Sequence, residues 1–525
     1  MPNSAPSVQM QRLSAGQLLA LLAILGLALG LRLWGAFADL PYIYHPDEPQ
    51  NIVAIQEMLA NRDPNPHLFL YPSLLYYVNA LAAIVHALPA WLSGASPTFA
   101  EPISIAMGAT LATDPDAVAL YRSMTICSGV LSVLLVYLIG RRARDVRTGL
   151  LAALLAAISP ILAADCRHVT SDSYVVLFEL FAILASLAIA DGGRRLSYVA
   201  AGIATGAAAA SKYNGAIVCV FPLVAHLLRC GFHWRASAPL WIAAVSSIAA
   251  FFCLSPYVLL DYEAFMGVIY QYRMYSGHHH GMEGNAPWWY LGVLWTSTGV
   301  ASLLALGQVT LAWRRRCVAT TLLAGFALPY FVFISSFSLR NERTLLPIVP
   351  CVLLLAAMCL TQMWTSPRLL PRISPGLRAL AIATVGMAAL LTPLFGTIKA
   401  ALALTTQDSR ATAREWINAT LPEHSVVAVE SYAPFVSPVR FRIVESERAI
   451  DHVPQWYVGH VDYVVLSQGT FGRYFADPQL YAAEVLRYSQ LVQSLKLVRR
   501  FVDGGYEIAV YATGKVPPGE PPASG

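Results

Sequence analysis

Long apolar runs separated by short basic loops fill the first 400 residues of the chain. A transmembrane helix needs about 20 consecutive apolar residues, and about eleven runs approach or exceed that length. These runs lie near residues 16–37, 119–140, 148–164, 173–190, 197–211, 213–229, 237–255, 289–312, 318–336, 344–363 and 379–397. The pattern predicts a polytopic α-helical membrane protein.

Arginine clusters between the runs predict the orientation of the chain. Arg141 to Arg144, Arg194-Arg195 and Arg314 to Arg316 are three of them. Because cytoplasmic loops of membrane proteins carry an excess of Lys and Arg, we expect these loops and the N-terminus inside. The residues after 400 are then expected outside.

Residues 73–92 form a further apolar run that does not fit this scheme as a span. Counting it as a crossing would place the Arg141 cluster outside. We therefore expect it to lie at the outer interface or to re-enter, within a long first outer loop at residues 39–118. A second crossing hidden at residues 100–113 is the alternative.

Composition agrees with a membrane protein and excludes other classes. Apolar residues make up 57% of the chain and charged residues 12%, against about 45–50% and 25% in soluble domains. A soluble enzyme, a disordered protein and a coiled coil are excluded. The eight cysteines show no CxxC spacing, so neither a disulfide framework nor a Cys-based zinc site is expected.

The last part of the chain has a different composition. From residue 401 onward, 11 basic and 13 acidic residues occur on a much less apolar background, which predicts a separate outer domain at residues 401–515. Helical patterns at 408–418 and 478–493, and strand patterns at 425–430, 461–466 and 506–511, predict a small α/β domain. Residues 516–525 are expected to be a disordered tail.

Acidic residues gather in the predicted outer loops. Asp47 and Glu48 follow the first span, and Asp165 and Asp172 occupy the next outer turn. Carboxylates at a membrane edge are costly to bury and often functional. Asp47 and Asp172 could instead be helix N-caps, and Arg167 could pair with either aspartate of its turn.

Basic residues are predicted on the same face. Lys212 follows an Ala/Gly-rich run, and Arg340 and Arg343 adjoin two spans. Arginines outside run against the positive-inside tendency, and an anionic ligand such as a phosphate would explain them. The alternatives are snorkelling of Lys212 to the interface and contact of the arginines with lipid headgroups.

Three consecutive histidines, His278, His279 and His280, fall in a long outer loop with flanking glycines. One or two of them could bind a divalent metal ion. Proton shuttling, substrate contact and a solvated loop are the other interpretations.

Taken together, a potential base beside concentrated positive charge, open to lipid, suits group transfer from a lipid phosphate or pyrophosphate. The sequence contains no phosphate-binding glycine loop, Walker lysine or Ser/His/Asp elbow. Nothing in it favours nucleotide-driven chemistry or nucleic-acid binding.

In the order of its motifs the sequence resembles the GT-C superfamily of membrane glycosyltransferases. The closer resemblance is to the bacterial group similar to protein O-mannosyltransferases and lipid A aminoarabinose transferases. The motifs are Asp47-Glu48, Tyr71 to Tyr77, Tyr121-Arg122-Ser123, Ser159-Pro160, Arg167 to Asp172, Ser211 to Gly215, Arg343 to Pro350, and Asp408 to Trp416.

The resemblance implies a multi-pass protein of the bacterial inner membrane with a periplasmic C-terminal domain. It implies a polyprenyl-phosphate-linked sugar donor and inverting transfer to a lipid, glycan or protein. Asp47 matches the general base and Glu48 its supporting acid, while Asp172 matches the aspartate of the second loop. Lys212 and Arg343 match groups that face the donor phosphate. Some relatives use a divalent metal ion and others need none.

Two other functions fit many of the same features. A transporter or flippase of lipid-linked sugars would also have many spans and an anion site. We find no internal repeat, and the polar residues cluster at one face rather than at the midplane. A polymer ligase or polymerase of the envelope would use the same kind of donor.

Overall fold

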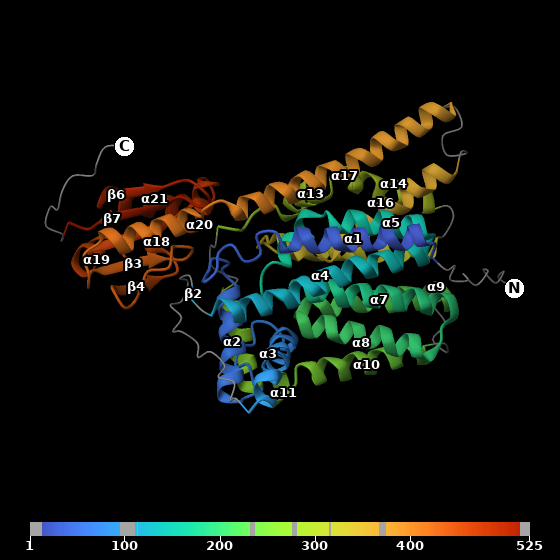
Figure 1. Ribbon diagram of the computed structural model, residues 1–525, viewed down its shortest axis with the longest axis horizontal. Helices are drawn as coiled ribbons and strands as arrows, with labels where there is room; N and C mark the ends of the chain where they lie inside the picture. The colour runs from blue at the N-terminus through green and yellow to red at the C-terminus, as the bar shows by residue number, and fades with distance from the viewer. Residues whose placement is uncertain are drawn as a thin grey trace.

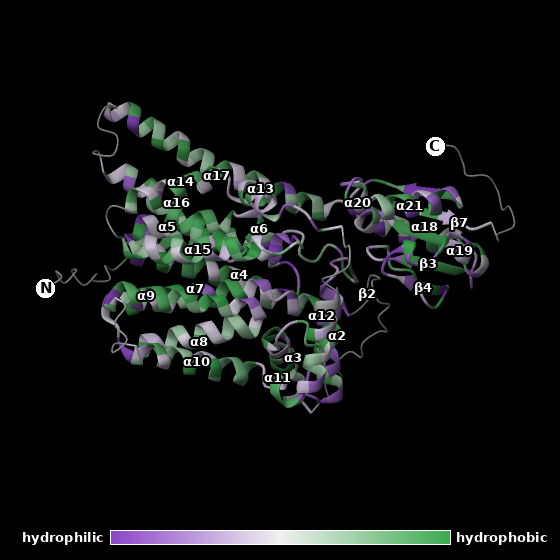
Figure 2. Cartoon of the chain, turned by 180° about the vertical axis from the view of Figure 1, so that it is seen from behind, coloured by the Kyte–Doolittle hydropathy of each residue, from purple (hydrophilic) through white to green (hydrophobic). Residues whose placement is uncertain are grey.

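The computed structural model describes residues 13–94, 111–112, 114–231, 237–275, 281–313, 317–366 and 374–514. Figure 1 shows a bundle of helices and, beyond one end of it, a smaller domain that contains a β-sheet. Figure 2 shows that the bundle helices are mainly hydrophobic along their length. The predicted fold class, a bundle of apolar helices with a small C-terminal α/β domain, is therefore confirmed.

The bundle consists of helices that run mostly along one direction. They are α1 (Ala15–Leu33), α4 (Pro115–Ala143), α5 (Val146–Ala157), α7 (Asp172–Gly192), α8 (Arg195–Ser211), α9 (Val220–Cys230), α10 (Ala238–Leu254), α13 (Ala286–Thr298), α14 (Val300–Trp313), α15 (Val318–Ser335), α16 (Ile348–Thr365) and α17 (Pro375–Thr405). Short helical segments connect or extend them, namely α6 (Pro160–Asp165), η1 (Tyr213–Cys219), α11 (Tyr257–Leu260), α12 (Tyr262–Tyr275) and η3 (Glu342–Leu345).

All eleven predicted runs are helical, but they are not equally long. Within the described residues, eight helices are long and apolar enough to cross a membrane, or nine if the pair α13 and α14, bent by 105°, is one span. Three predicted runs form shorter helices, because α5 has 12 residues and α8 and α10 have 17 each. One of the eight helices that are long and apolar enough is α3 (Leu74–Leu92). It corresponds to the run at residues 73–92, for which we predicted no crossing.

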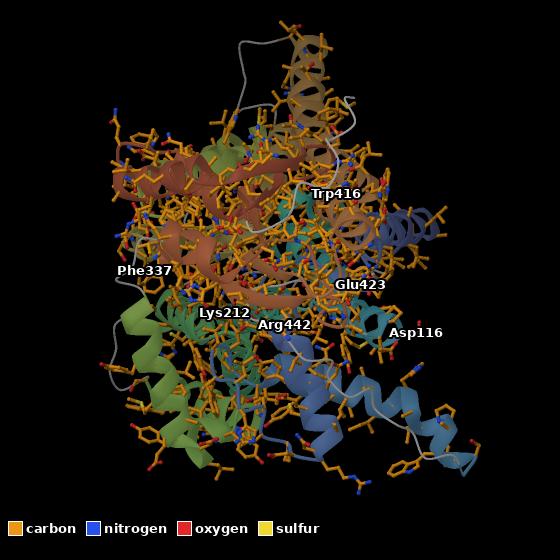
Figure 3. The ribbon with its side chains drawn as sticks, turned by 90° about the vertical axis from the view of Figure 1, so that its left-hand side faces the viewer. Asp116, Lys212, Phe337, Trp416, Glu423 and Arg442 are labelled. Carbon is orange, nitrogen blue, oxygen red and sulfur yellow. The ribbon has the colours of Figure 1, made fainter. Side chains whose placement is uncertain are left out.

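Helix α3 lies at the end of the bundle that faces the sheet domain, together with α2 (Glu48–Asn61). In Figure 1 the axis of α2 is nearly perpendicular to the bundle helices. In Figure 3, which looks along the bundle from that end, α3 runs across the view. This transverse arrangement agrees with a helix at the outer interface, which stays a prediction. The alternative crossing at 100–113 lies almost wholly outside the described residues.

Close packing of α8 against α10 fixes the position of Lys212. A Cβ added to Gly202 or Gly206 of α8 would collide with the backbone carbonyl oxygens of Ala243 and Ser247 in α10. Small residues at such spacing let helix backbones approach closely in membranes. The Ala/Gly-rich run before Lys212 is therefore part of a helix–helix contact.

The C-terminal domain is a five-stranded mixed sheet with helices packed on it. Its strands are β3 (Val426–Glu430), β4 (Arg442–Ser446), β5 (Tyr463–Ser467), β6 (Lys496–Phe501) and β7 (Ile508–Ala512), in the order β4-β3-β5-β7-β6. Strands β4, β3 and β5 are parallel, whereas β7 pairs antiparallel with both β5 and β6. Its helices are α18 (Ser409–Thr420), α19 (Pro454–His460), α20 (Gln468–Phe475) and α21 (Ala482–Gln493), with the short turn η5 (Ala449–Asp451).

Sequence patterns predicted three of these strands and two of these helices. Strands β4 and β6 were missed because their burial is irregular and most of their residues are exposed or half-buried, so the alternation typical of a half-buried strand is weak. Helix α17 continues past residue 400 to Thr405, and α18 begins at Ser409. The tail at 516–525 lies outside the described residues.

Candidate active site

Four charged residues from distant parts of the chain form one continuous cluster. Arg343 donates a hydrogen bond to Oδ2 of Asp47, 296 positions away. The same guanidinium has its Nη1 3.9 Å from Oδ2 of Asp172. Lys212 completes the cluster, because its Nζ lies 2.7 Å from Oδ1 of Asp172. The order Asp47, Arg343, Asp172, Lys212 therefore alternates in charge.

Helix ends bring these four side chains together. Asp47 precedes α2 and Asp172 is the first residue of α7, while Lys212 ends α8. Arg343 lies in the short 3-10 turn η3. Asp47 occupies an N-cap position, but its side chain makes no capping hydrogen bond. The interpretation of Asp47 as a simple helix cap is therefore wrong.

The cluster is mostly shielded from water. The side chains of Asp47 and Arg343 are 24% and 21% exposed, and that of Asp172 is 6% exposed. Burial acts to raise the pKa of Asp47, but the charge of Arg343 outweighs it and holds that pKa below its usual range. Asp47 is therefore a carboxylate at neutral pH, able to accept a proton once its partner is removed.

A histidine and a tyrosine border the cluster. His45 stacks on His168 with 4.3 Å between ring centroids. Burial, assisted by the charges of His168 and Arg343, lowers the pKa of His45 to about 3, so its ring is neutral under physiological conditions. On the other side, Lys212 Nζ lies 5.7 Å from the ring centroid of Tyr71. Burial and the charges of Asp47 and Asp172 raise the pKa of Tyr71.

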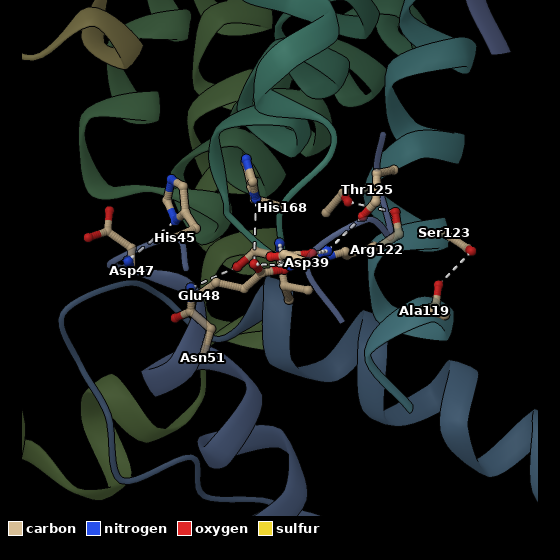
Figure 4. A network of polar contacts seen from close by, with 12 residues as sticks. Asp39, His45, Asp47, Glu48, Asn51, Ala119, Arg122, Ser123, Thr125 and His168 are labelled. Carbon is tan, nitrogen blue, oxygen red and sulfur yellow. Dashed lines mark hydrogen bonds and ion pairs between the residues drawn. The ribbon is translucent and has the colours of Figure 1, made fainter. Parts of the chain in front are cut away.

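Glu48 does not join Asp47 in the cluster, contrary to its predicted role as a supporting acid. It is fully buried and forms a two-pronged ion pair with Arg122, with both N···O distances 2.7 Å. Arg122 also binds Asp39 at 2.6 and 3.0 Å. Figure 4 shows the carboxylates of Asp47 and Glu48 pointing apart. The correction follows from geometry, since adjacent residues at a helix start project about 100° apart.

Glu48 also anchors the start of α2 to another part of the chain. Its Oε1 also accepts the backbone N–H of Val169 at 3.0 Å, which joins the first outer loop to the turn before α7. The sequence analysis gave no role to Arg122, the partner of Glu48. An arginine within the apolar run at 119–140 was the signal that it needed an acidic partner.

Asp165 is a further carboxyl group at this end of the bundle. It is 8% exposed, and neither of its side-chain oxygens has a hydrogen-bond partner in the described part of the chain. Burial and the charge of Asp172 raise the pKa of Asp165 to about 7. Both protonation states are thus accessible near neutral pH. The sequence placed Asp165 in this turn without giving it a role.

No hydrogen bond or ion pair joins Arg340 to the described residues of the cluster, and its predicted contact with the donor phosphate stays a prediction. Its Nε and Nη2 donate to the carbonyl oxygens of Met282 and Glu283 at 3.0 and 2.6 Å. Its backbone N–H also donates to Met282. These bonds hold the segment before α13 against the turn before η3. His278, His279 and His280 lie outside the described residues.

The described ranges contain no group of three or more His, Cys, Asp or Glu side chains able to hold a metal ion. Lys212 and Arg343 are the cations that the geometry places at the cluster. Figure 3 looks onto this end of the molecule and labels Lys212 near the middle of the view.

Comparison with known proteins adds a family match and structural relatives. Residues 100–259, which include Arg122, Asp172 and Lys212, match the family model described as dolichyl-phosphate-mannose-protein mannosyltransferase. The comparison with curated proteins gives no match.

Solved structures of membrane glycosyltransferases share the fold. An oligosaccharyltransferase from Archaeoglobus fulgidus is 13% identical with a TM-score of 0.55, and the match covers 95% of this chain and 74% of that one. ArnT from Cupriavidus metallidurans bound to undecaprenyl phosphate is 15% identical with a TM-score of 0.55, over 96% of this chain and 99% of that one. The archaeal enzyme AglB, also from A. fulgidus, in complex with an inhibitory peptide and a dolichol-phosphate, is 13% identical with a TM-score of 0.50, over 96% and 75%.

The fold is that of the GT-C membrane glycosyltransferases. The predicted resemblance is thereby confirmed, both by the family model over its central part and by the fold over nearly its whole length.

Proposed function

We propose that this protein transfers a sugar from a polyprenyl-phosphate-linked donor to an envelope acceptor, with inversion at the anomeric carbon. The alternating cluster of Asp47, Arg343, Asp172 and Lys212 is the observation that carries the proposal. It combines a carboxylate base with two fixed cations at the mouth of a membrane bundle. Relatives of the same fold hold undecaprenyl phosphate or dolichol-phosphate.

In this proposal the donor phosphate binds to Arg343 and Lys212. The planar guanidinium of Arg343 can hold two phosphate oxygens, whereas the Lys212 ammonium acts as a point charge. Negative charge grows on the phosphate as the sugar leaves. In the low dielectric of this partly buried cluster, fixed cations stabilise that charge more strongly than they would in water.

Binding of the phosphate also activates Asp47. Arg343 now lowers the pKa of Asp47, so a phosphate that neutralises Arg343 makes the carboxylate a stronger base. Asp47 then accepts the proton of the acceptor hydroxyl, whose oxygen attacks the anomeric carbon opposite the phosphate. The bond from the anomeric carbon to the phosphate oxygen breaks, and polyprenyl phosphate leaves with the electron pair.

We further propose that this chemistry takes place on the periplasmic face of the bacterial inner membrane. Arg142 pairs with Asp191 at 2.8 Å, at the end of α7 opposite to Asp172. The arginine-rich end of the bundle belongs in the cytoplasm by the positive-inside tendency. The cluster and the C-terminal domain then lie outside.

A transfer assay tests the proposal. The full chain in proteoliposomes is given a polyprenyl-phosphate sugar and an envelope extract, and free polyprenyl phosphate, labelled acceptor and the sidedness of the donor are measured. Release of the lipid phosphate together with labelling of the acceptor supports an enzyme. Movement of the donor across the bilayer without bond cleavage would show a carrier and overturn the proposal.

A further inference from the structure

A large cavity separates the first outer loop from the C-terminal domain. Its volume is about 540 Å³. Four tyrosines line it, Tyr42 and Tyr44 from the loop and Tyr432 and Tyr506 from the domain, together with four arginines, two aspartates and two histidines. The charged residues and histidines are Arg122, Arg167, Arg410, Arg414, Asp39, Asp408, His45 and His168.

Arg167 is the buried cation of this cavity that lacks an acidic partner. It is 2% exposed, and the one hydrogen bond recorded for its side chain runs from Nη2 to the carbonyl oxygen of Leu31 at 2.8 Å. Its Nε has no hydrogen-bond partner among the described residues. The expected ion pair with Asp165 or Asp172 does not form, and burial lowers the pKa of Arg167 to about 10.

The other arginines of the cavity wall are already neutralised by carboxylates. Arg122 binds Asp39 and Glu48, and Arg410 binds Asp408 at 2.8 Å. Arg414 lies 3.6 Å from the Glu415 carboxylate. Among the described residues that line the cavity, Arg167 is therefore the guanidinium with no carboxylate within 4 Å.

A structural role accounts for only part of Arg167. Its bond to Leu31 satisfies a carbonyl in the last turn of α1, where a cation is favourable. A guanidinium has five N–H donors, so most of them stay unused. A buried charge without a counter-charge is costly, and an oxyanion in the cavity would remove that cost.

The cavity borders the residues next to the cluster, because Pro46 and His45, which directly precede Asp47, line it. Nδ1 of His45 lies 3.3 Å from the backbone N–H nitrogen of Asp47. Figure 4 shows His45 and His168 side by side next to Asp47. Arg343 and Lys212, the proposed donor cations, are not among the lining residues. An occupant of the cavity would therefore lie beside His45, next to Asp47 in the chain, and away from the proposed donor cations.

We infer that this cavity binds an oxyanion carried by the acceptor, a phosphate or a carboxylate, with Arg167 as its charged partner. That the occupant is the acceptor rests on the proposed function. That the cavity is an anion site does not. The four tyrosines supply rings and hydroxyl groups suited to the uncharged part of a glycan or glycolipid.

Binding of inorganic phosphate tests the anion site without any turnover. Phosphate should raise the melting temperature of the full chain in a saturable manner. Part of this phosphate-dependent rise should persist in the Lys212→Gln, Arg343→Gln double variant. Adding Arg167→Gln should weaken that remaining response at least about tenfold. Arg142→Gln, which removes an exposed arginine at the other end of the bundle, is the matched control and should change nothing.

A second variant leaves Arg167 and its structural bond intact. Ala411→Asp adds a negative charge to the cavity wall from α18 and should abolish the remaining phosphate response by repelling a second anion from the cavity. A response that survives Ala411→Asp, or one that disappears with the donor cations alone, would overturn the inference.

Transfer assays then identify the source of the anion. In an active preparation, Arg167→Gln should raise the acceptor concentration needed for half-maximal transfer at least about tenfold and leave that of the donor unchanged. An effect confined to the donor would assign the anion to the donor phosphate and overturn the acceptor part. Absence of transfer in the parent chain would count against the proposed function and not against the anion site.

Discussion

Replacing Asp47 by Asn should separate catalysis from donor binding. The amide keeps the shape of the side chain but cannot accept the acceptor proton. It also releases Arg343, which donates to the Asp47 carboxylate in the present structure. Turnover should therefore fall, whereas affinity for the donor phosphate should stay equal or rise.

The sizes of both effects follow from the geometry. General-base assistance is worth about 10²- to 10⁴-fold, so kcat should fall by that amount. The Asp47–Arg343 pair has side chains 24% and 21% exposed, and such partly exposed pairs contribute at most about 1 kcal/mol. Loss of this competitor should therefore tighten donor binding by no more than about fivefold.

The assay measures turnover and donor affinity in the same preparation. Release of polyprenyl phosphate gives kcat, and binding of a non-transferable donor analogue gives affinity. Asp191→Asn is the matched control, because it removes an exposed carboxylate paired with Arg142 at the other end of α7. Parental turnover in Asp47→Asn would remove Asp47 from the mechanism, and donor binding weakened tenfold would show that Asp47 holds the donor instead.

Three further predictions concern the neighbours of Asp47 and the topology. Arg343→Lys keeps the charge but loses the planar fork, so kcat should fall about tenfold, and Arg343→Ala should lose more. Parental transfer rates in both variants would contradict phosphate binding by Arg343. Burial acts to raise the pKa of Glu48, but the charge of Arg122 outweighs it and holds that pKa below 4.5. The ion pair therefore stabilises the fold above about pH 4.5, and this stabilisation is lost as the pH falls further. Glu48→Gln should accordingly lower the unfolding free energy by about 3–5 kcal/mol at pH 7 and make the melting temperature depend less on pH in the acidic range. An unchanged melting temperature in the variant would exclude a structural role of Glu48. If α3 does not cross the membrane, single cysteines that replace Arg62 and Ser93 should both react with an impermeant reagent in intact cells. A cysteine that replaces Arg142 should react only after permeabilisation. If position 93 is protected while position 62 reacts, α3 crosses the membrane.

Much of the fold was predictable because hydropathy and charge act locally. Apolar runs must form helices in lipid, where every backbone polar group has to be paired internally, and all eleven runs do so. Arginine positions, read against the positive-inside tendency, assigned Asp47, Asp172, Lys212 and Arg343 to one face. The structure gathers those four residues at one end of the bundle.

Pairing within that face was decided only by the tertiary structure. The sequence grouped Glu48 with Asp47 because they are neighbours, whereas the turn at the start of α2 directs Glu48 to Arg122 and Asp47 to Arg343. It grouped Arg340 with Arg343 for the same reason, but Arg340 binds the carbonyl oxygens of residues 282 and 283.

Sequence therefore determined which chemical groups reach the outer end of the bundle, since membrane insertion depends on the hydropathy and charge of each segment. Tertiary packing decided which of those groups touch. The partners of Arg343 lie 296 and 171 positions away, at the ends of different helices, and their meeting depends on where each helix ends and how it packs. The unpaired state of Arg167 likewise arises from the meeting of α1, the turn before α7 and the C-terminal domain, and no local pattern in the chain encodes that arrangement.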